Sequence, residues 1–346
     1  MKRYLIPIAG LILATGCISD NTPSTGEKVQ EYLAVWMAKW NQDNGKDVQP
    51  GKLGLYILED IPGPATADEW SKDSSYTYAS VTIRTLTGTI SSTNDENLAK
   101  QLGTYSPENY YGPTVFMTGD KISYAGVDAA LEGMRIGGTR TVAIPAWLLT
   151  TSRYSSLDDY IEACSSENSL VYTITLEGQF DDAAVWEKER VRAYIDANYP
   201  GAQSSVMPGA DSADDTFWFI SDSTSFLAAN RRETLATDFK INYTGSRLDG
   251  VVFDTSLERV AIDNDIYSSS KTYGPLSVVF YENWSDTKIN SSSEYIDAFK
   301  AAVHKLGWEG QEATVIFTSA HGYSSTGSGN SIPAYCPLVF NLQLVK

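Results

Sequence analysis

The chain has 346 residues, of which 42% are hydrophobic and 12% aromatic, enough apolar material for two sizeable cores. Its formal net charge of −17 disfavours a nucleic-acid partner and direct adhesion to anionic lipid. It contains only two histidines, His304 and His321, and no clustered Cys, His and carboxylate spacing. The sequence therefore predicts no metal site, no cofactor and no His-based nucleophilic triad.

The first 17 residues are organised like an export signal. Lys2 and Arg3 form a short basic region, and the apolar stretch of residues 4–14 is too short for a comfortable membrane span. It ends in LATGC, residues 13–17, which resembles a bacterial lipobox. In that reading the signal is cleaved before Cys17, whose thiol then carries lipid. The alternative is an ordinary signal peptide with a chance cysteine.

The residues after this signal predict an anchored protein. Residues 18–26 are polar and are expected to act as a tether. Ser19, Asp20 and Asn21 resemble the acidic tag on surface-exposed lipoproteins of the Bacteroidetes. We therefore expect a lipid-anchored outer-membrane protein of the cell envelope, on either its periplasmic or its surface side. Because a disulfide between Cys164 and Cys336 would join two separate cores, we expect these to be two buried thiols.

The remaining sequence is an internal repeat whose matched positions keep one constant spacing. The segment GLYILED matches FWFISD, LTGT matches LDGV, and YGP occurs in both copies. The matched positions are Asp60 and Asp222, Gly88 and Gly250, and Pro113 and Pro275. A repeat of this length predicts two complete domains rather than a solenoid of small units. We assign them to residues 27–180 and 181–346.

Each copy is expected to begin with an amphipathic helix, at residues 27–41 and 183–198, where apolar side chains recur at helical spacing. The tryptophans of these helices are expected to pack against the sheet that follows, and the second helix also covers the junction between the copies. One further helix is predicted in each copy, at residues 126–134 and 293–306. Strands are predicted at residues 141–144, 170–176, 313–317 and 338–345. Many antiparallel strands with one packed helix indicate an α+β fold.

The stretch NYTGSRLDGVVFDTS, residues 242–256, reads as strand, turn and strand. It places Tyr243, Phe253 and Asp254 on neighbouring strands. The stretch resembles the Y-T-G-x-L-x-D-G-x-x-F-D signature of FKBP-type peptidyl-prolyl cis-trans isomerases. Residues 318–344 resemble the S-x-x-A-Y-G-x-x-G-x-G-x-x-I-P-x-x-x-P-L-x-F-x-V-x-L close of the same family. The resemblance implies two tandem FKBP-like domains, each a twisted antiparallel sheet wrapped around a short helix.

The resemblance also implies a pocket between helix and sheet in the second copy. Tyr243 and Phe253 would form one wall beside Asp254, and Arg259 falls where a partner for that Asp is common. The backbone amide of Ile296 would anchor substrate, and the hydroxyl of Tyr323 would point at a substrate carbonyl. The implied site residues are Tyr243, Phe253, Asp254, Ile296, Phe299, Tyr323, Ile332 and Phe340, with Phe299 as the floor and the last two closing the far side. The alternative is that these are simply core aromatics.

The second copy departs from the family pattern in several places. Leu276 and Val278 occupy positions where Phe is common, which implies a wider and less aromatic cavity. Ala298 and Ser324 replace glycines. Residues 280–294 lengthen the connection into the helix, and their Trp284 is expected either to cover the pocket mouth or to cap a loop. We expect His321, two residues from the pocket tyrosine, to be an exposed loop histidine.

The first copy has lost the residues that the resemblance places in the pocket. The positions of Tyr243, Phe253 and Asp254 are occupied by Val81, Ser91 and Ser92. The floor aromatic is replaced by Val127, and the position of Tyr323 is occupied by Thr150. Only the counterpart of Phe340 is still aromatic, as Tyr172. Residues 126–145 nevertheless stay close to the family's helix-and-strand pattern. We therefore expect the first copy to be a structural or peptide-binding module.

The resemblance implies a prolyl isomerase or folding helper that acts on proline-containing polypeptides outside the cytoplasm through its second copy. A dry aromatic cavity suits this reaction, since it disfavours the polar planar amide and requires no acid–base chemistry. Two other functions remain open. One is a non-catalytic peptide- or protein-binding envelope lipoprotein, and the other is a purely architectural surface lipoprotein.

Overall fold

The computed structural model describes residues 24–118, 123–152, 154–163, 168–221, 238–307 and 309–345. The predicted export signal, the predicted lipidation site Cys17, most of the predicted tether and Cys164 lie outside the described residues. The first described helix, α1 (Thr25–Asn44), begins within the last residues assigned to the tether. It does so because Ser24 caps it: the Ser24 hydroxyl accepts from the Glu27 amide at 3.1 Å, and the Glu27 carboxylate accepts from the Ser24 amide at 2.6 Å.

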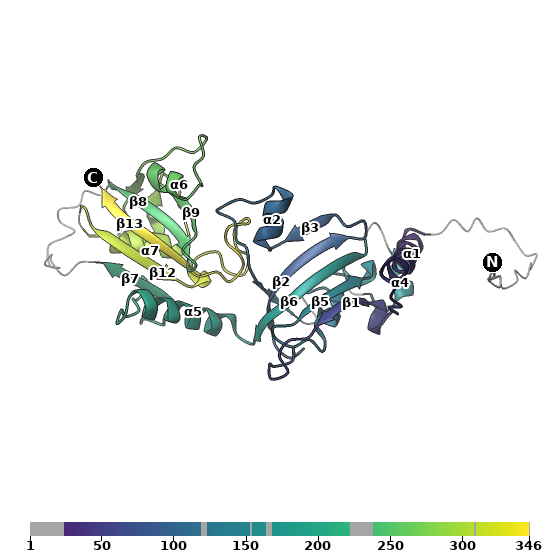
Figure 1. The fold of residues 1–346 in the computed structure, drawn as a ribbon. Coiled ribbons are helices and arrows are strands. Elements are labelled where there is room, and N and C mark those ends of the chain that lie inside the picture. The colour runs from purple at the N-terminus through teal and green to yellow at the C-terminus, as the bar shows by residue number, and fades with distance from the viewer. Residues whose placement is uncertain are drawn as a thin grey trace, which may run out of the picture.

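The first copy contains one antiparallel sheet with strand order β1-β5-β6-β2-β3, and β4 also pairs with β2 (Figure 1). Its strands are β1 (Tyr56–Ile61), β2 (Tyr76–Thr85), β3 (Ile90–Thr93), β4 (Thr114–Met117), β5 (Thr139–Ile144) and β6 (Leu170–Phe180). Its other helices are η1 (Lys52–Gly54), α2 (Glu96–Leu102), α3 (Ala125–Leu131), η2 (Ala146–Leu148) and α4 (Leu157–Ala163).

The second copy contains a second antiparallel sheet with strand order β11-β10-β8-β13-β12-β7, and β9 also pairs with β8. Its strands are β7 (Phe217–Ser221), β8 (Asp238–Arg247), β9 (Val252–Thr255), β10 (Leu276–Val279), β11 (Lys288–Ile289), β12 (Glu312–Phe317) and β13 (Leu338–Val345). Its helices are α5 (Ala183–Asn198), α6 (Glu258–Asp263), η4 (Trp284–Asp286), α7 (Asp297–Lys305) and η5 (Ser319–His321). Figure 1 shows the two sheets at opposite ends of an elongated molecule.

The sequence repeat is also a structural repeat. Strands β2, β3 and β4 start at residues 76, 90 and 114, and β8, β9 and β10 start at 238, 252 and 276, which is the spacing of the matched sequence positions. The order β1-β5-β6-β2-β3 of the first sheet recurs as β7-β12-β13-β8 with β9 paired to β8. The α+β prediction is therefore confirmed, with two antiparallel sheets and a helix packed on each.

Each sheet is covered by two helices, one on each of its faces. In the second copy, Phe299 and Val303 of α7 share a core with Val315, whereas Val191 of α5 packs with Ile316. Neighbouring residues of a strand point to opposite faces, so α7 and α5 lie on opposite sides of the sheet. In the first copy α3 and α1 are placed in the same way, each on its own cluster of buried side chains. Burial of each large apolar side chain contributes roughly 1.5–3 kcal/mol.

The predicted helices and strands are mostly confirmed, and helix α5 matches its predicted bounds. The expectation of a single further helix in each copy was wrong, because α2, α4 and α6 are also present. They contain only 7, 7 and 6 residues, too few for a helical period to stand out in the sequence. Helix α7 is shorter than predicted and begins at Asp297, after Ile296 in extended conformation.

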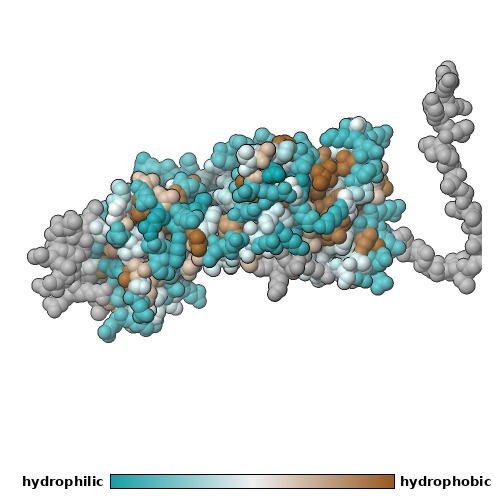
Figure 2. All heavy atoms as spheres, turned by 90° about the horizontal axis from the view of Figure 1, so that it is seen from below, coloured by the Kyte–Doolittle hydropathy of each residue, from teal (hydrophilic) through white to brown (hydrophobic). Residues whose placement is uncertain are grey.

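Most of the surface is hydrophilic, as Figure 2 shows for one face, in keeping with the acidic composition. On that face the exposed hydrophobic side chains gather mainly at the end of the molecule that carries the first sheet. Within the described ranges, no helix combines the length and the apolar character that crossing a membrane requires.

Candidate functional site

The hairpin of β8 and β9 brings Tyr243, Phe253 and Asp254 together. Its turn closes at Gly250, which has a φ of 85° and donates its amide to the Arg247 carbonyl at 3.0 Å. The left-handed backbone at this position favours glycine, which explains the D-G pair of the motif. The strand–turn–strand prediction for residues 242–256 is thereby confirmed, with a register shift between Gly245 and Ser246.

Four aromatic rings from three parts of the second copy meet over the hairpin. Tyr243 lies edge-on to Phe299 of α7 at 5.6 Å between ring centroids, and Phe299 lies edge-on to Phe340 of β13 at 5.3 Å. Phe253 of β9 meets Phe340 at 5.9 Å, also edge-on. Edge-to-face pairs at these distances are favourable because the positive ring edge meets the negative ring face. We call these four rings, from Tyr243, Phe253, Phe299 and Phe340, the aromatic cluster.

Gly245 makes this packing possible. A Cβ at this position would lie 2.8 Å from a ring carbon of Phe253 and 2.9 Å from one of Phe340. Both distances are shorter than real Cβ contacts allow, so a side chain here would push the rings apart. The glycine belongs to the Y-T-G motif, yet the sequence did not single it out as a residue that shapes the site.

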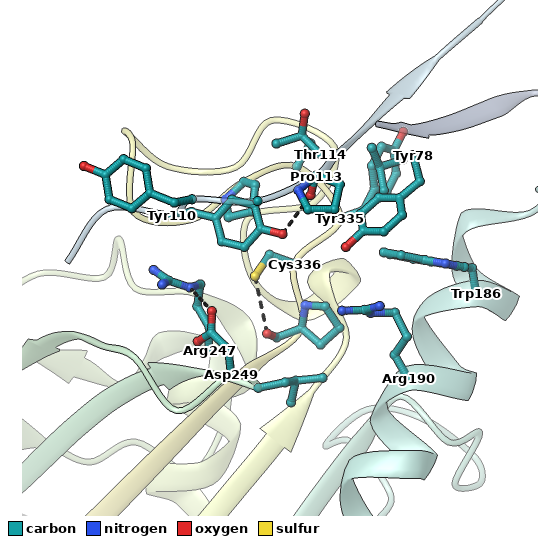
Figure 3. A pocket seen from close by; sticks show the side chains of 17 residues that line it. Tyr78, Tyr110, Pro113, Thr114, Trp186, Arg190, Arg247, Asp249, Tyr335 and Cys336 are labelled. Carbon is teal, nitrogen blue, oxygen red and sulfur yellow. Dashed lines mark hydrogen bonds and ion pairs between the residues drawn. The ribbon is translucent and has the colours of Figure 1, made fainter. Parts of the chain in front are cut away.

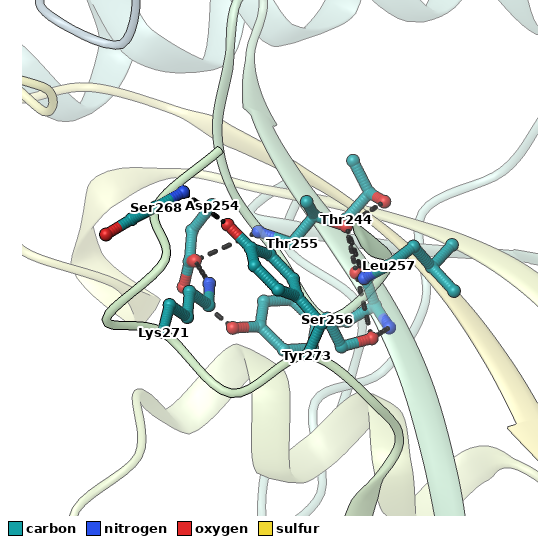
Figure 4. Close-up of polar contacts among 9 residues, drawn as sticks. Thr244, Asp254, Thr255, Ser256, Leu257, Ser268, Lys271 and Tyr273 are labelled. Carbon is teal, nitrogen blue, oxygen red and sulfur yellow. Dashed lines mark hydrogen bonds and ion pairs between the residues drawn. The ribbon is translucent and has the colours of Figure 1, made fainter. Parts of the chain in front are cut away.

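Asp254 sits at the edge of the aromatic cluster with its charge balanced (Figure 4). One carboxylate oxygen accepts from the Tyr243 hydroxyl at 2.7 Å, and the other accepts from the Thr255 amide at 2.9 Å. That second oxygen also forms an ion pair with the ammonium group of Lys271. Lys271 comes from the loop between α6 and β10, and its ammonium lies 5.9 Å from the Tyr243 ring centroid.

The expectation that Arg259 would be the partner of Asp254 was wrong. Arg259 lies on α6 with its side chain 81% exposed, and it pairs with Asp263 one turn later at 2.7 Å. Lys271 is the partner of Asp254, in the position that was predicted for Arg259. Because Lys271 follows Asp254 only after a helix and a loop, no local pattern in the sequence indicates the pairing.

The tyrosines around Asp254 are held in their neutral form. Burial, reinforced by the negative charge of Asp254, raises the pKa of Tyr243, and the same two causes raise the pKa of Tyr323 and Tyr295. Each phenol therefore keeps its proton at neutral pH and acts as a hydrogen-bond donor rather than a base.

The remaining predicted site residues pack onto the same core. Ile332 is buried at 4% exposure, and Ile296 and Tyr323 are half-buried against the cluster. Ile296 is the N-cap residue of α7, and none of the hydrogen bonds among the described residues uses its backbone N–H. Within the same ranges no acceptor is found for the Tyr323 hydroxyl. The site thus offers two polar groups able to donate to an incoming ligand.

Several residues that the sequence did not assign extend the site. Tyr295 stacks on Phe299 at 5.6 Å, and Phe317 stacks on Phe340 at 5.8 Å. Trp284 packs half-buried against the same core, with the Lys300 ammonium 5.7 Å from its ring. Val278 is fully buried in the same core, where it contributes an aliphatic side chain.

His321 is not an exposed loop residue. It is half-buried in η5, and its Nε2 lies 2.9 Å from the Thr216 hydroxyl. Burial lowers the pKa of His321, so the imidazole is neutral at physiological pH. The expectation failed because the loop between β12 and β13 folds back over the start of β7. Ser324, which replaces a glycine, has a φ of 52°, a left-handed conformation that is uncommon outside glycine.

Among its described residues, the first copy has no equivalent of the aromatic cluster. Tyr172 is buried at the position of Phe340, but no ring pairs with it among the described residues. Val127 is buried where the floor aromatic would be, and the Ser91 hydroxyl donates to the Ile83 carbonyl at 3.2 Å. Thr150 is buried too. Across the described part of the chain, no three His, Cys, Asp or Glu side chains are grouped so that they could hold a metal ion.

Many solved chains are similar to this one, and three of them serve as examples. The structure of the three FKBP domains of wheat FKBP73 is 14% identical with a TM-score of 0.28, over 85% of this chain and 95% of that one. A peptidyl-prolyl cis-trans isomerase from Pseudomonas syringae pv. tomato is 16% identical with a TM-score of 0.29, over 48% of this chain and 96% of that one. FkpA from Escherichia coli is 18% identical with a TM-score of 0.30, over 48% and 59%. No family model matches the chain, and no curated protein does.

Proposed function

We propose that the protein is a peptidyl-prolyl cis-trans isomerase that acts on proline-containing polypeptides through its second copy. The reaction rotates an amide bond across a barrier of about 18–20 kcal/mol set by amide resonance. No covalent bond to the enzyme is required. A catalyst therefore has to bind the twisted amide more tightly than either planar form.

The observation that carries this proposal is the aromatic cluster, with a balanced charge at its edge. Rings that exclude water disfavour the planar amide, whose resonance makes it more polar than the twisted one. The Tyr323 hydroxyl and the Ile296 amide are available to hold the carbonyls of the substrate. Since Asp254 is already bonded to Tyr243, Thr255 and Lys271, its role is to fix the Tyr243 ring rather than to move a proton.

The test is a prolyl isomerisation assay on a short peptide, with wild type, Phe253→Ala and Tyr323→Phe. We expect both variants to lower kcat/KM, Phe253→Ala by roughly ten-fold or more because it opens the ring wall to water, and Tyr323→Phe by less because it removes one hydrogen bond of about 1 kcal/mol. Ser91→Ala, at the matching position of the first copy, should leave activity unchanged. The proposal fails if the wild type does not accelerate isomerisation.

One observation favours a second function, peptide binding without efficient turnover. Leu276 and Val278 make one wall aliphatic where Phe is common, which weakens the aromatic enclosure of a substrate. An aromatic-lined groove can hold an extended proline-containing segment without catalysis. This function predicts that wild type lacks isomerase activity but binds a proline-containing peptide. A macrocyclic inhibitor typical of the FKBP family should bind to the second copy only, and mapping it to the first copy would contradict both functions.

We further propose that the protein acts at the cell envelope, anchored through lipid on Cys17. The support is the lipobox-like segment LATGC and the polar residues after it. Metabolic labelling with a radioactive fatty acid should mark the wild type but not Cys17→Ala. A chain lacking residues 1–17 should fold and remain soluble, and its insolubility would count against the tethered arrangement.

A further inference from the structure

The loop that carries Tyr323 and Ile332 is held from outside the second sheet. This loop, residues 318–337 between β12 and β13, is called the site loop below. At its start, the amide and the hydroxyl of Ser319 donate to the two carboxylate oxygens of Glu187 at 2.6 and 2.7 Å. Glu187 lies on α5, the helix that joins the two copies, and is only 3% exposed. The near end of the site loop is thus tied to the connecting helix.

The far part of the site loop is tied to the first copy. The Tyr110 amide donates to the Asn330 carbonyl at 2.8 Å. One guanidinium nitrogen of Arg247 donates both to the Ser331 carbonyl at 2.8 Å and to the Glu108 carbonyl at 3.0 Å. This single nitrogen therefore clamps the first copy to the residue that precedes Ile332.

Arg247 is well placed for this task. Its side chain is 4% exposed, and its charge is balanced by Asp249 at 3.1 Å. The guanidinium carbon lies 5.3 Å from the centroid of the Tyr110 ring. Figure 3 shows both side chains at the edge of the same pocket. A buried guanidinium fixes its acceptors strongly, because each unmade bond would leave a desolvated donor.

The contact between Arg247 and Tyr110 lies beside a hollow at the boundary of the two copies. A cavity of about 260 Å³ lies between them. Its lining includes Tyr78, Trp186, Arg190, Tyr335 and Cys336 (Figure 3). Because this space is not filled by packed side chains, the copies meet through the contacts around it, which include an edge-on ring pair of Tyr76 and Tyr335 at 5.3 Å.

The segment of the first copy that makes the contact has a counterpart in the second copy. Tyr105 stacks on Tyr111 at 5.4 Å, and Tyr267 stacks on Tyr273 at 5.5 Å. In each copy the second tyrosine hydroxyl accepts from the amide one residue after the first tyrosine, at 3.0 Å. We call residues 105–111 and 267–273 the tyrosine-framed loops. They are the same structure, separated by the spacing of the sequence repeat.

The tips of the two loops contact different partners. In the second copy the tip carries Lys271, which pairs with Asp254 of its own copy. In the first copy Asn109 stands at that position and Ser92 stands for Asp254, so this ion pair cannot form. Its tip instead reaches the second copy, where the carbonyls of Glu108 and Asn109 accept from Arg247 and the Tyr110 amide meets the site loop.

We propose that the first copy is a positioning element for the site of the second: its tyrosine-framed loop, through Tyr110 and Arg247, fixes the site loop and thereby Ile332 and Tyr323. This inference rests on the proposed function for its effect on turnover, but not for its effect on the loop. It gives the copy without an aromatic cluster a task that explains why its fold is kept. Tyr110 and Arg247 are positioning residues, since neither touches the aromatic cluster.

The test uses the full-length chain with Tyr110→Ala, Arg247→Met and the control Arg140→Met. Arg140 is a matched control because it is also buried, bonds Asp60 and the carbonyls of Ala130 and Glu132, and lies within the first copy. Hydrogen exchange of residues 328–332 reads the site loop directly. Tyr110→Ala keeps the backbone amide but removes the ring that lies on the Arg247 guanidinium and the hydroxyl that donates to the Pro113 carbonyl. We expect exchange in the site loop to become about ten-fold faster in Tyr110→Ala and Arg247→Met, and to stay within two-fold of wild type in Arg140→Met.

The second measurement separates positioning from general damage. For a proline-containing peptide, we expect KM to rise three- to ten-fold in Tyr110→Ala with kcat within two-fold, because the ring cluster is intact while Ile332 is displaced. Tyr110→Ala leaves the sequence of the second copy untouched, so it remains informative if Arg247→Met unfolds. Unchanged exchange in Tyr110→Ala overturns the inference, and so does faster exchange with unchanged KM.

The failure of the proposed function would be visible separately. If wild type has no isomerase activity, the proposed function is wrong, and the dissociation constant of a fluorescent proline-containing peptide replaces KM. The inference then requires that this constant rises at least three-fold in Tyr110→Ala, and an unchanged constant overturns it.

Discussion

Replacing Phe340 by leucine tests whether the aromatic cluster is an energetic unit. Phe340 is 6% exposed and meets Phe253, Phe299 and Phe317 at 5.9, 5.3 and 5.8 Å. Each such pair contributes about 0.5–1.5 kcal/mol beyond the area that it buries, and neighbouring pairs are not additive. Leucine fills much of the volume, so little cavity energy is added. We expect a loss of about 2–3 kcal/mol in the free energy of unfolding of the second copy.

Tyr172→Leu is the matched control, because Tyr172 is equally buried at the corresponding position but has no ring partner in the described part of the chain. We expect it to cost about 1 kcal/mol, as a swap of similar volume does. Urea unfolding, followed by hydrogen exchange in β12 and β13 against β5 and β6, reads the two copies separately. Phe340→Leu should also lower kcat/KM about ten-fold, whereas Tyr172→Leu should not. Equal destabilisation by the two variants would refute the idea of a ring network.

Three further predictions concern charged and titrating groups. Burial raises the folded-state pKa of Glu187 above 4.5, so the folded protein holds this proton more tightly than the unfolded chain. Wild type should therefore lose stability relative to Glu187→Gln as pH rises from 4.5 to 7.5. A constant difference in the free energy of unfolding between the two proteins would contradict this. Burial raises the pKa of the Cys336 thiol from 9.0 to about 12. In a variant with no other cysteine, alkylation at pH 8 should therefore be about a thousand-fold slower in the native than in the unfolded protein. Equal rates would show that the native thiolate is accessible. Lys271→Met should cost less than about 1 kcal/mol, because the ion pair with Asp254 is partly exposed, and a larger loss in thermal unfolding would mean that the pair is more than a surface bridge.

Much of the fold follows from patterns that the sequence carries locally. Helix α5 and strand β13 have their predicted bounds, because Val191 and Ile195 recur at helical spacing in α5 and Phe340, Leu342 and Leu344 alternate with polar residues in β13. The constant spacing of the repeat aligns β2, β3 and β4 with β8, β9 and β10. Short helices such as α6 were missed, since six residues are too few to show a period.

The site was predictable where its residues could be matched to the family pattern, which covers the hairpin, the start of helix α7 and the stretch from Tyr323 to Phe340. Tyr243, Phe253 and Asp254 lie together because a hairpin sets their distance. Lys271 and Tyr295 were missed, because their places depend on how a loop and a helix start fold back onto the hairpin. The partner of Asp254 was misassigned for the same reason: on α6 an i, i+4 pair with Asp263 is available to Arg259, and it turns that side chain to solvent.

The two tyrosine-framed loops have the same shape but make different contacts. Two stacked phenol rings and one hydrogen bond from a backbone amide to a tyrosine hydroxyl maintain the shape of each loop. The residues at the tip of the loop take no part in these contacts. The shape of each loop is therefore independent of the partner that its tip contacts. The same scaffold thus presents a cation to its own copy in one case and backbone carbonyls to the other copy in the second case.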